Sequence, residues 1–325
     1  MQTMKLTKRG RLPDVASIIE IRRLWPAFLI IMIFQGCSRS SPSPEGRQQK
    51  PSQNEEFKSY WYSGKAEVNS YNLDQSRYGE QREGKAVLIF VKEDFSRTKQ
   101  VKLDDPSSSA TDKLGVLKMN FTKNFVTGIY PYSMMLSVFS PIEEDPYRHA
   151  VKVTMSSQEW CGHVFSQMNL WANSYSFVGH SYFEKEGEEK FSLKSDLLED
   201  ELWNTIRLAP ENLPIGDVKL IPGLFITRLK HSELKSLNAN ISKSESGEVV
   251  SYAVSLPDQE RNLTIHYQKQ FPHKILGWEE IFNEQGQKRE TRATLDKTLV
   301  VDYWRKNKNE FRYMRDSLGL SPNNY

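Results

Sequence analysis

The sequence from Phe57 onward predicts a mainly β fold, in which an antiparallel, curved or barrel-like sheet carries one or two helices packed on or across it. Residues 86–91 form a short apolar run, and residues 151–155 alternate between apolar and polar side chains, which is the period of a half-buried strand. Candidate hairpin turns lie between such runs at Gly187, 246–247 and 285–286. Many short strands separated by turns favour a sandwich or a barrel-like sheet.

The same patterns predict a β-rich domain over residues 57–304. Further strands are expected at 59–73, 114–126, 134–140, 158–169, 174–183, 218–230, 248–255, 262–269, 274–282 and 296–304. In the strand at 274–282 the side chains of Glu279 and Glu280 point to opposite faces, so only one of them can point inward. The C-terminal tail, 305–325, contains a second candidate helix at 305–317.

One helix is predicted at 196–208, between a front set and a back set of strands. Ser195 or Asp196 can cap its first turn, and acidic residues follow at 199–201. Apolar side chains recur at helical spacing, and two prolines follow; these residues are Leu198, Leu202, Ile206, Pro210 and Pro214. We expect this helix to cover an open end of the barrel-like sheet.

The first 36 residues are typical of a signal peptide. A basic stretch precedes an apolar run at 24–34, and Gly36-Cys37 follows. A transmembrane helix needs about 20 apolar residues, and this run is much shorter. Gly36-Cys37 resembles the lipobox of bacterial lipoproteins, which implies cleavage before Cys37 and acyl chains such as palmitate on its thiol. The alternative is an ordinary cleaved signal peptide, with Cys37 an incidental free thiol.

Residues 38–56 contain no large apolar side chain, so we expect residues 37–56 to be a lipidated cysteine followed by a disordered tether. The position after Cys37 is not Asp, which by analogy with Gram-negative lipoproteins favours the outer membrane, facing the periplasm. The membrane, reached through the lipid on Cys37, is then the first expected partner.

Charge excludes one class of partner. Six of the 44 basic and two of the 41 acidic side chains lie within residues 1–36, so the processed chain is close to neutral. Nucleic-acid binding needs a basic patch, and none is visible. With Cys37 acylated, Cys161 is the only other cysteine in the sequence, so no intramolecular disulfide is expected.

Common catalytic motifs are missing from the sequence. Ser63-Gly64-Lys65 lacks the first glycine of a phosphate-binding loop, and Ala66 stands where that loop has Ser or Thr. The sequence contains no His-Glu-x-x-His, Gly-x-Ser-x-Gly or Gly-x-Gly-x-x-Gly motif. The six histidines show no metal-binding spacing, so we expect no metal and no cofactor.

The segment 156–163 is the strongest candidate for chemistry. On a single strand, Glu159, Cys161 and His163 would share one face, which is a possible arrangement of a nucleophile with its base. The structural alternative is that Cys161 is a small buried hydrophobe beside hydrogen-bonded His163 and Glu159.

Aromatic and methionine side chains form a second candidate cluster. Such residues usually fill a core, but a barrel wide enough to hold a cavity could use them to line a site for one apolar ligand. The candidate lining residues are Tyr130, Tyr132, Met134, Met135, Trp160 and Trp171.

Three segments carry a resemblance to a known family: 61–67 (WYSGKAE), 123–135 (KNFVTGIYPYSMM) and 156–163 (SSQEWCGH). They resemble Gram-negative bacterial lipoproteins that are often labelled "septum formation inhibitor Maf", over most of residues 57–304. The Maf nucleotide pyrophosphatases begin with Ala-Ser-x-Ser-Pro-Arg-Arg on an α/β fold, and nothing in this sequence matches that start. The ending around 271–273 also looks like exported half-barrel proteins that are similar to lipoprotein carriers.

Three hypotheses follow from the sequence. The first is a non-catalytic envelope lipoprotein that binds an apolar ligand or an envelope protein. The second is an envelope hydrolase or thiol enzyme that uses Cys161 and His163. The third is the nucleotide pyrophosphatase activity that the family label implies.

Overall fold

The computed structural model describes residues 55–107, 111–142 and 149–320. The chain divides into two compact units, 1–47 and 48–325, and every described residue lies in the second. The signal peptide, Cys37 and most of the tether (37–54) predicted above therefore lie outside the described residues.

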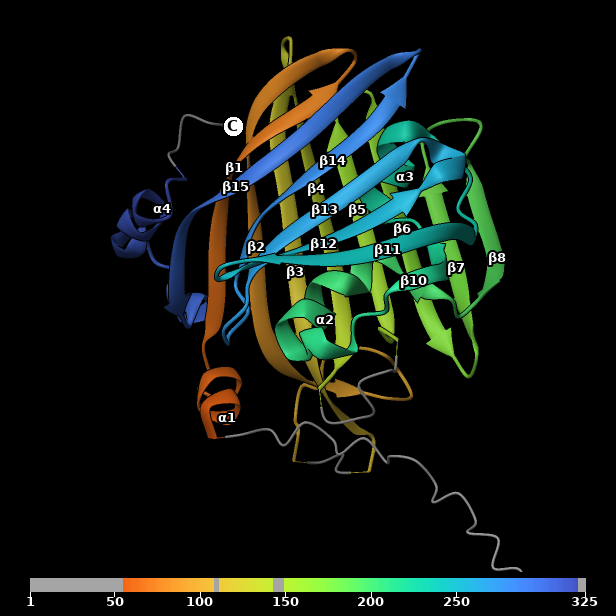
Figure 1. The fold of residues 1–325 in the computed structure, drawn as a ribbon. Coiled ribbons are helices and arrows are strands. Elements are labelled where there is room, and N and C mark those ends of the chain that lie inside the picture. Colours follow the sequence, from red (N-terminus) through yellow and green to blue (C-terminus); the bar gives the residue numbers. More distant parts are fainter. Residues whose placement is uncertain (1–54, 108–110, 143–148, 321–325) are drawn as a thin grey trace, which may run out of the picture. The chain divides into compact units, whose positions relative to one another are not determined.

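Fifteen strands form one sheet, as Figure 1 shows. They are β1 (Ala66–Arg77), β2 (Glu80–Ser96), β3 (Lys113–Thr127), β4 (Tyr130–Pro141), β5 (Lys152–Glu159), β6 (Gly162–Trp171), β7 (Ser174–Ser181), β8 (Glu188–Lys194), β9 (Leu197–Leu198), β10 (Gly216–Ile221), β11 (Leu237–Ser246), β12 (Val249–Leu256), β13 (Arg261–Gln268), β14 (Ile275–Glu284) and β15 (Gln287–Val301).

The sheet is antiparallel except where β9 pairs with β10. Consecutive strands are neighbours in the sheet except for β8 and β9, and the first strand, β1, pairs with the last, β15. The edges of the sheet are β8 and β9. The predicted mainly β, antiparallel and curved fold with packed helices is therefore confirmed.

Alternating side chains give the sheet an apolar inner face. In β12, for example, Val250, Tyr252, Val254 and Leu256 are buried while the residues between them are partly exposed. The predicted hairpin turns are confirmed at Gly187, 246–247 and 285–286. Gly247 and Gly286 have φ values of 58° and 77°, which glycine adopts without the steric cost that a side chain would add.

The sheet folds over two short helices, α2 (Leu202–Leu208) and α3 (Leu224–Lys230), as Figure 1 shows. Trp203 of α2 contacts Phe121 of β3 and Trp278 of β14, with ring centroids 5.3 Å apart in both cases. Phe225 of α3 also contacts Phe121, at 5.2 Å. Helix side chains therefore fill the space between the two halves of the sheet.

The helix predicted at 196–208 is shorter than expected. Leu197 and Leu198 form β9, a 3-10 turn follows at Glu199–Glu201, and α2 begins at Leu202. Ser195 and Asp196 do not cap it. The Glu201 carboxylate instead accepts the N–H of Leu198, at 3.0 Å.

Two predicted strands contain helices that the sequence analysis missed. The strand at 59–73 is α1 (Glu55–Trp61) followed by β1, and the strand at 218–230 is β10 followed by α3. Phe57 and Trp61 are four residues apart on α1, and both are buried, so tertiary packing stabilises this single amphipathic turn. Strands β8 and β11 were also missed.

The C-terminal segment lies on the outer face of the sheet. Where a helix was predicted at 305–317, the chain forms 3-10 turns at Tyr303–Arg305 and Asn309–Phe311 and then α4 (Tyr313–Ser317). Leu318 and Leu320 are buried against Val68 and Val87. Among the residues that the structure describes, no helix is long and apolar enough to span a membrane.

Candidate functional site

The segment 156–163 is a hairpin and not the single strand that was predicted. β5 ends at Glu159 and β6 begins at Gly162, so Trp160 and Cys161 form the turn between them. Glu159 is buried and His163, which pairs across the ladder with Gln158, is exposed. The expected common face is therefore wrong, because Glu159 and His163 point to opposite faces of the sheet.

Cys161 is exposed in this turn, which also rules out the buried small hydrophobe of the alternative reading. The Glu159 carboxylate accepts the Cys161 backbone N–H at 2.6 Å. Hydrogen bonding to Glu159, with some desolvation, raises the pKa of the Cys161 thiol. A raised pKa opposes formation of the thiolate, which is the nucleophilic form of cysteine. The positive charge of Arg228 acts in the opposite direction, but the influence of Glu159 outweighs it.

The six candidate lining residues do not share one surface. Tyr132 and Met134 are buried on the inner face of β4, and Tyr132 stacks on Phe125 at 4.8 Å. Met135, Trp160 and Trp171 are exposed, and Tyr130 is half-buried. The prediction combined core and surface residues in one group. Neighbouring residues of β4 face opposite sides of the sheet, and the prediction did not separate the two sides.

Two hollows of the interior are small. One of about 30 Å³ lies among charged side chains, and the other, of about 50 Å³, lies beside α3. A water molecule needs at least about 10–15 Å³ of such space, so each hollow accommodates only a few waters. The large interior cavity for an apolar ligand is therefore not found at either place.

The smaller hollow contains a buried ion network around Arg261. Its guanidinium donates to both oxygens of Glu199 at 2.6 Å and to Glu280 at 2.5–2.6 Å. Glu280 is the inward member of the acidic pair predicted from the sequence, and Glu279 pairs outside with Arg292 at 3.1 Å. The expectation that only one of the two carboxylates points inward is confirmed.

Lys123 and Asp200 are the other two ionisable residues of this network. Among the described residues, they form no ion pair with each other. Burial lowers the pKa of Lys123, whose amino group lies 3.4 Å from Gln75 Oε1 and about 5.5 Å from the Phe225 ring centre. Burial raises the pKa of Asp200 to about 7, although the backbone N–H of Leu224 donates to its carboxylate at 3.0 Å.

A second buried ion pair joins β1 to α2. Arg207 donates to the two oxygens of Glu67 at 2.6 and 2.7 Å, and to the carbonyl of Pro272 at 2.9 Å. Burial opposes ionisation of Glu67, but the Arg207 guanidinium prevails and lowers its pKa to about 2. The pair holds the helix to the sheet.

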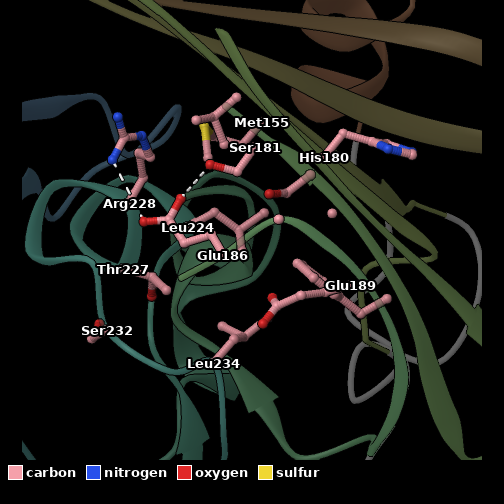
Figure 2. A pocket seen from close by; sticks show the side chains of 15 residues that line it. Met155, His180, Ser181, Glu186, Glu189, Leu224, Thr227, Arg228, Ser232 and Leu234 are labelled. Atoms are coloured by element: carbon pink, nitrogen blue, oxygen red, sulfur yellow. Dashed lines mark hydrogen bonds and ion pairs between the residues drawn. The ribbon is translucent and has the colours of Figure 1, made fainter. Parts of the chain in front are cut away.

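The hollow beside α3 is polar on one side, as Figure 2 shows. Glu186 lies between Ser181, whose hydroxyl donates to it at 2.8 Å, and Arg228, at 3.7 Å. Arg228 is almost fully buried, and its Nε has no hydrogen-bond partner among the described residues. The imidazole of His180 lies apart from this group in Figure 2. With about 50 Å³ of space, the hollow accommodates water and not an organic substrate.

An open polar pocket of about 490 Å³ lies at the end of the sheet that carries the β6–β7 turn. His149 lines it, and its Nδ1 lies 2.7 Å from the buried Glu201. The hydrogen bond to Glu201 raises the pKa of His149, which favours the imidazolium. The pair therefore fixes the orientation of the His149 ring in the wall of the pocket.

The fourth hollow, larger than the three above, is an apolar groove of about 610 Å³ on the outer face of the sheet. We call it the outer groove. It lies between strands β1, β2, β3 and β15 and the C-terminal segment, and it is lined by Val68, Val87, Ile89, Thr122, Asn124, Leu299, Val301, Tyr303, Lys306, Phe311, Met314, Arg315, Leu318 and Leu320.

Gly319 lets the C-terminal segment close one side of the outer groove. Its φ of 64° follows α4, and a Cβ there would lie 2.5 Å from Asp296 Oδ2. The glycine therefore permits both the left-handed turn and the close approach that bring Leu318 and Leu320 onto the sheet. The sequence analysis missed the outer groove. The sequence feature that could have indicated this groove is the presence of apolar residues at outward-facing positions of the strands at 66–77 and 86–91.

Among the described residues no cluster of three or more metal-ligating side chains occurs. No protein-family model, curated protein or solved structure matches the chain in the three comparisons made.

Proposed function

We propose that this protein is a membrane-tethered, non-catalytic envelope lipoprotein that binds an apolar ligand, such as a lipid acyl chain, in the outer groove. The observation that carries the proposal is the outer groove itself, with about 610 Å³ of space and a mostly aliphatic lining. Ligand sites for small molecules usually measure about 300–1,000 Å³ and are mainly apolar, with a few polar groups.

The polar groups of the outer groove favour a ligand with an acidic head. Lys306 lies at its margin, 3.8 Å from Asp302 and over the ring of Phe311. An ammonium at the mouth of an aliphatic groove would attract a phosphate or carboxylate headgroup, while the acyl chain replaces water along Ile89, Leu299 and Met314.

The tether supports the same proposal. The basic and apolar segments before Cys37 are those of an export signal, and a lipid on Cys37 would hold the domain at a membrane. Mass spectrometry of the protein recovered from membranes tests this step. The expected first residue is an acylated Cys37, and a Cys37→Ala variant should be released; an unmodified Cys37 or an intact leader contradicts it.

A bulky substitution inside the outer groove tests ligand binding. Thr122 of β3 lines the groove, is half-buried and faces outward. Thr154 of β5 is also a half-buried, outward-facing threonine, but it does not line the groove, so it serves as the control. Thr122→Trp should fill the groove, weaken binding of a fluorescent fatty acid by about tenfold or more, and reduce co-purifying lipid in native mass spectrometry. Thr154→Trp should bind like the unchanged protein. Equal binding by both variants would place the ligand elsewhere and overturn the proposal.

A further inference from the structure

One end of the sheet carries a row of exposed aromatic and apolar side chains. The turns β1–β2, β3–β4, β5–β6 and β7–β8 all lie at this end, because consecutive antiparallel strands turn there in pairs. Each turn presents at least one large side chain. We call the row Tyr78, Ile129, Tyr130, Trp160 and Tyr182 the aromatic rim.

Contacts between neighbouring turns make the aromatic rim continuous. The hydroxyl of Tyr78 lies 2.8 Å from that of Tyr132, whose ring is 5.9 Å from the ring of Tyr130. Tyr130 in turn lies 6.4 Å from Trp160, measured between ring centres. Tyr182 packs so closely on Gly162 that a Cβ at that glycine would lie 2.6 Å from the Tyr182 ring.

The outermost side chains of the rim are mostly in contact with solvent. The exposed fractions are 81% for Ile129, 68% for Trp160 and 70% for Tyr182. Single exposed apolar residues are normal, but a contiguous row marks an interaction surface. On the inward side of the β1–β2 turn, Arg77 donates to the carbonyl of Leu229 and to the hydroxyl of Tyr132.

The charge of the rim indicates which kind of surface the rim can bind. The two central turns, 126–131 and 158–163, contain one acidic side chain, the buried Glu159, and no Lys or Arg. On the outer flank, the β7–β8 turn at 182–187 contains Glu184 and Glu186 but only one basic residue, Lys185. The β1–β2 turn differs, because the Arg77 guanidinium lies over the Tyr78 ring and a Cβ on Gly79 would lie 3.1 Å from the guanidinium of Arg289. The other three turns offer no electrostatic attraction to anionic lipid or nucleic acid, and their contribution to binding is apolar.

We propose that the aromatic rim inserts into the headgroup region of a zwitterionic phospholipid membrane. Trp and Tyr prefer this region because their rings are apolar and their N–H and O–H groups are polar. Each turn of the rim presents one or two of these side chains at the end of a hairpin, where they can enter a deformable lipid surface. The inference goes beyond acyl binding in the outer groove and does not rest on it.

The position of the rim separates it from the predicted lipid anchor. α1 enters the sheet at the first residue of β1, and Tyr78 follows the last residue of the same strand. Twelve strand residues span about 40 Å, so the rim lies roughly that far from the point where the tether enters.

Quenching of Trp160 by brominated phosphatidylcholine tests the proposal in the full chain. Because bromine quenches only nearby indoles, a protein held solely by its N-terminal lipid would leave Trp160 unquenched. We expect quenching in the unchanged protein. In Trp160→Phe the quenched component should disappear while vesicle binding persists, because Phe keeps the apolar contact.

Matched variants separate the rim from other exposed tryptophans. In Ile129→Ser/Trp160→Ser, affinity for phosphatidylcholine vesicles at the rim should fall by about tenfold or more. Trp171→Ser, which alters an exposed tryptophan at the opposite end of the sheet, should retain both binding and quenching.

Three outcomes would overturn the proposal. The first is identical quenching in the unchanged protein and in Trp160→Phe. The second is binding that requires phosphatidylglycerol and falls with added salt, which would indicate an electrostatic contact elsewhere. The third is a concentration-dependent dimer that the double Ser variant abolishes, without any vesicle effect, which would assign the rim to contact between copies of the chain.

Discussion

Asp200 is a buried acid, and its burial makes the stability of the fold depend on pH. The unfolded chain releases this proton at about pH 4, whereas burial raises the pKa of the folded residue to about 7. Between these values the folded state binds more protons than the unfolded state, so stability falls as the pH rises from about 4 to about 7. Above that window the contribution of Asp200 no longer changes.

Asp200→Asn should remove this pH dependence. Asn can still accept the N–H of Leu224 but cannot ionise, so the variant should gain about 1–3 kcal/mol relative to the unchanged protein on going from pH 5 to pH 8. Urea unfolding followed by circular dichroism at the two pH values measures the gain. Asp258→Asn, at an exposed carboxyl, serves as the control and should give no such gain. An equal response of both variants would show that Asp200 is ionised in the fold throughout this range.

The position of these charges was only partly predictable. Glu280 could be placed inward because it alternates with Glu279 on a strand. Lys123 follows the same rule, since it shares the inner face with Phe121 and Phe125. Its burial was not predicted because lysine is rarely inside, and the charges brought by distant strands and by the 3-10 turn at Glu199–Glu201 make that burial tolerable. Cys161 was misplaced because one turn within 156–163 reverses the chain.

The buried pair Glu67–Arg207 is the strongest single link between a helix and the sheet. Both side chains are almost fully buried, and Arg207 also lies over the ring of Phe90, 4.6 Å from its centre. Removing one partner from such a pair leaves an uncompensated buried charge, which is costlier than removing both.

Glu67→Gln should therefore destabilise the protein by about 3–5 kcal/mol, measured by chemical unfolding. The double variant Glu67→Gln/Arg207→Met should recover at least about 1 kcal/mol of that loss, since Met replaces the buried charge. Glu245→Gln at the exposed pair with Lys269 should cost less than about 1 kcal/mol. If the double variant is no more stable than Glu67→Gln, the pair matters for packing and not for charge compensation.

The short helices explain most of the errors in the predicted elements. α1 and α3 have seven residues each, which is two turns, so their apolar spacing cannot be told from that of a strand in sequence. Their helical form depends on contacts with residues far away in the chain, such as Phe225 with Phe121. The long strands, by contrast, repeat the period of two often enough to be recognised.

The fold class, most strands and three hairpin turns could be predicted because each depends on local alternation and local turn chemistry. The pairing order of the sheet could not, since nothing in the sequence of β1 specifies β15 as its neighbour. The outer groove was missed for the same reason, because it requires β1, β15 and the C-terminal segment to come together.

The two edges and the centre of the sheet should differ in local stability. β8 pairs with β7 alone and has no buried residue, while β3 pairs on both sides and is mostly buried. We expect the amides of β8 that bond to β7 to exchange with deuterium at least about a hundredfold faster than those of β3. Exchange followed by mass spectrometry of peptides covers both strands. Equal protection would mean that β8 is covered by something in solution.

The pairing of β1 with β15 has a consequence for how the chain reaches its native state. In space, the strands follow the order β9 to β15 and then β1 to β8. This is a simple antiparallel meander in which the first and last strands of the chain, β1 and β15, lie side by side at the middle. A ribosome releases β1 first and its partner last, more than two hundred residues later. Until β15 is synthesised, β1 has no partner on one side, and this unpaired edge of the first eight strands is open to chaperones and to other chains.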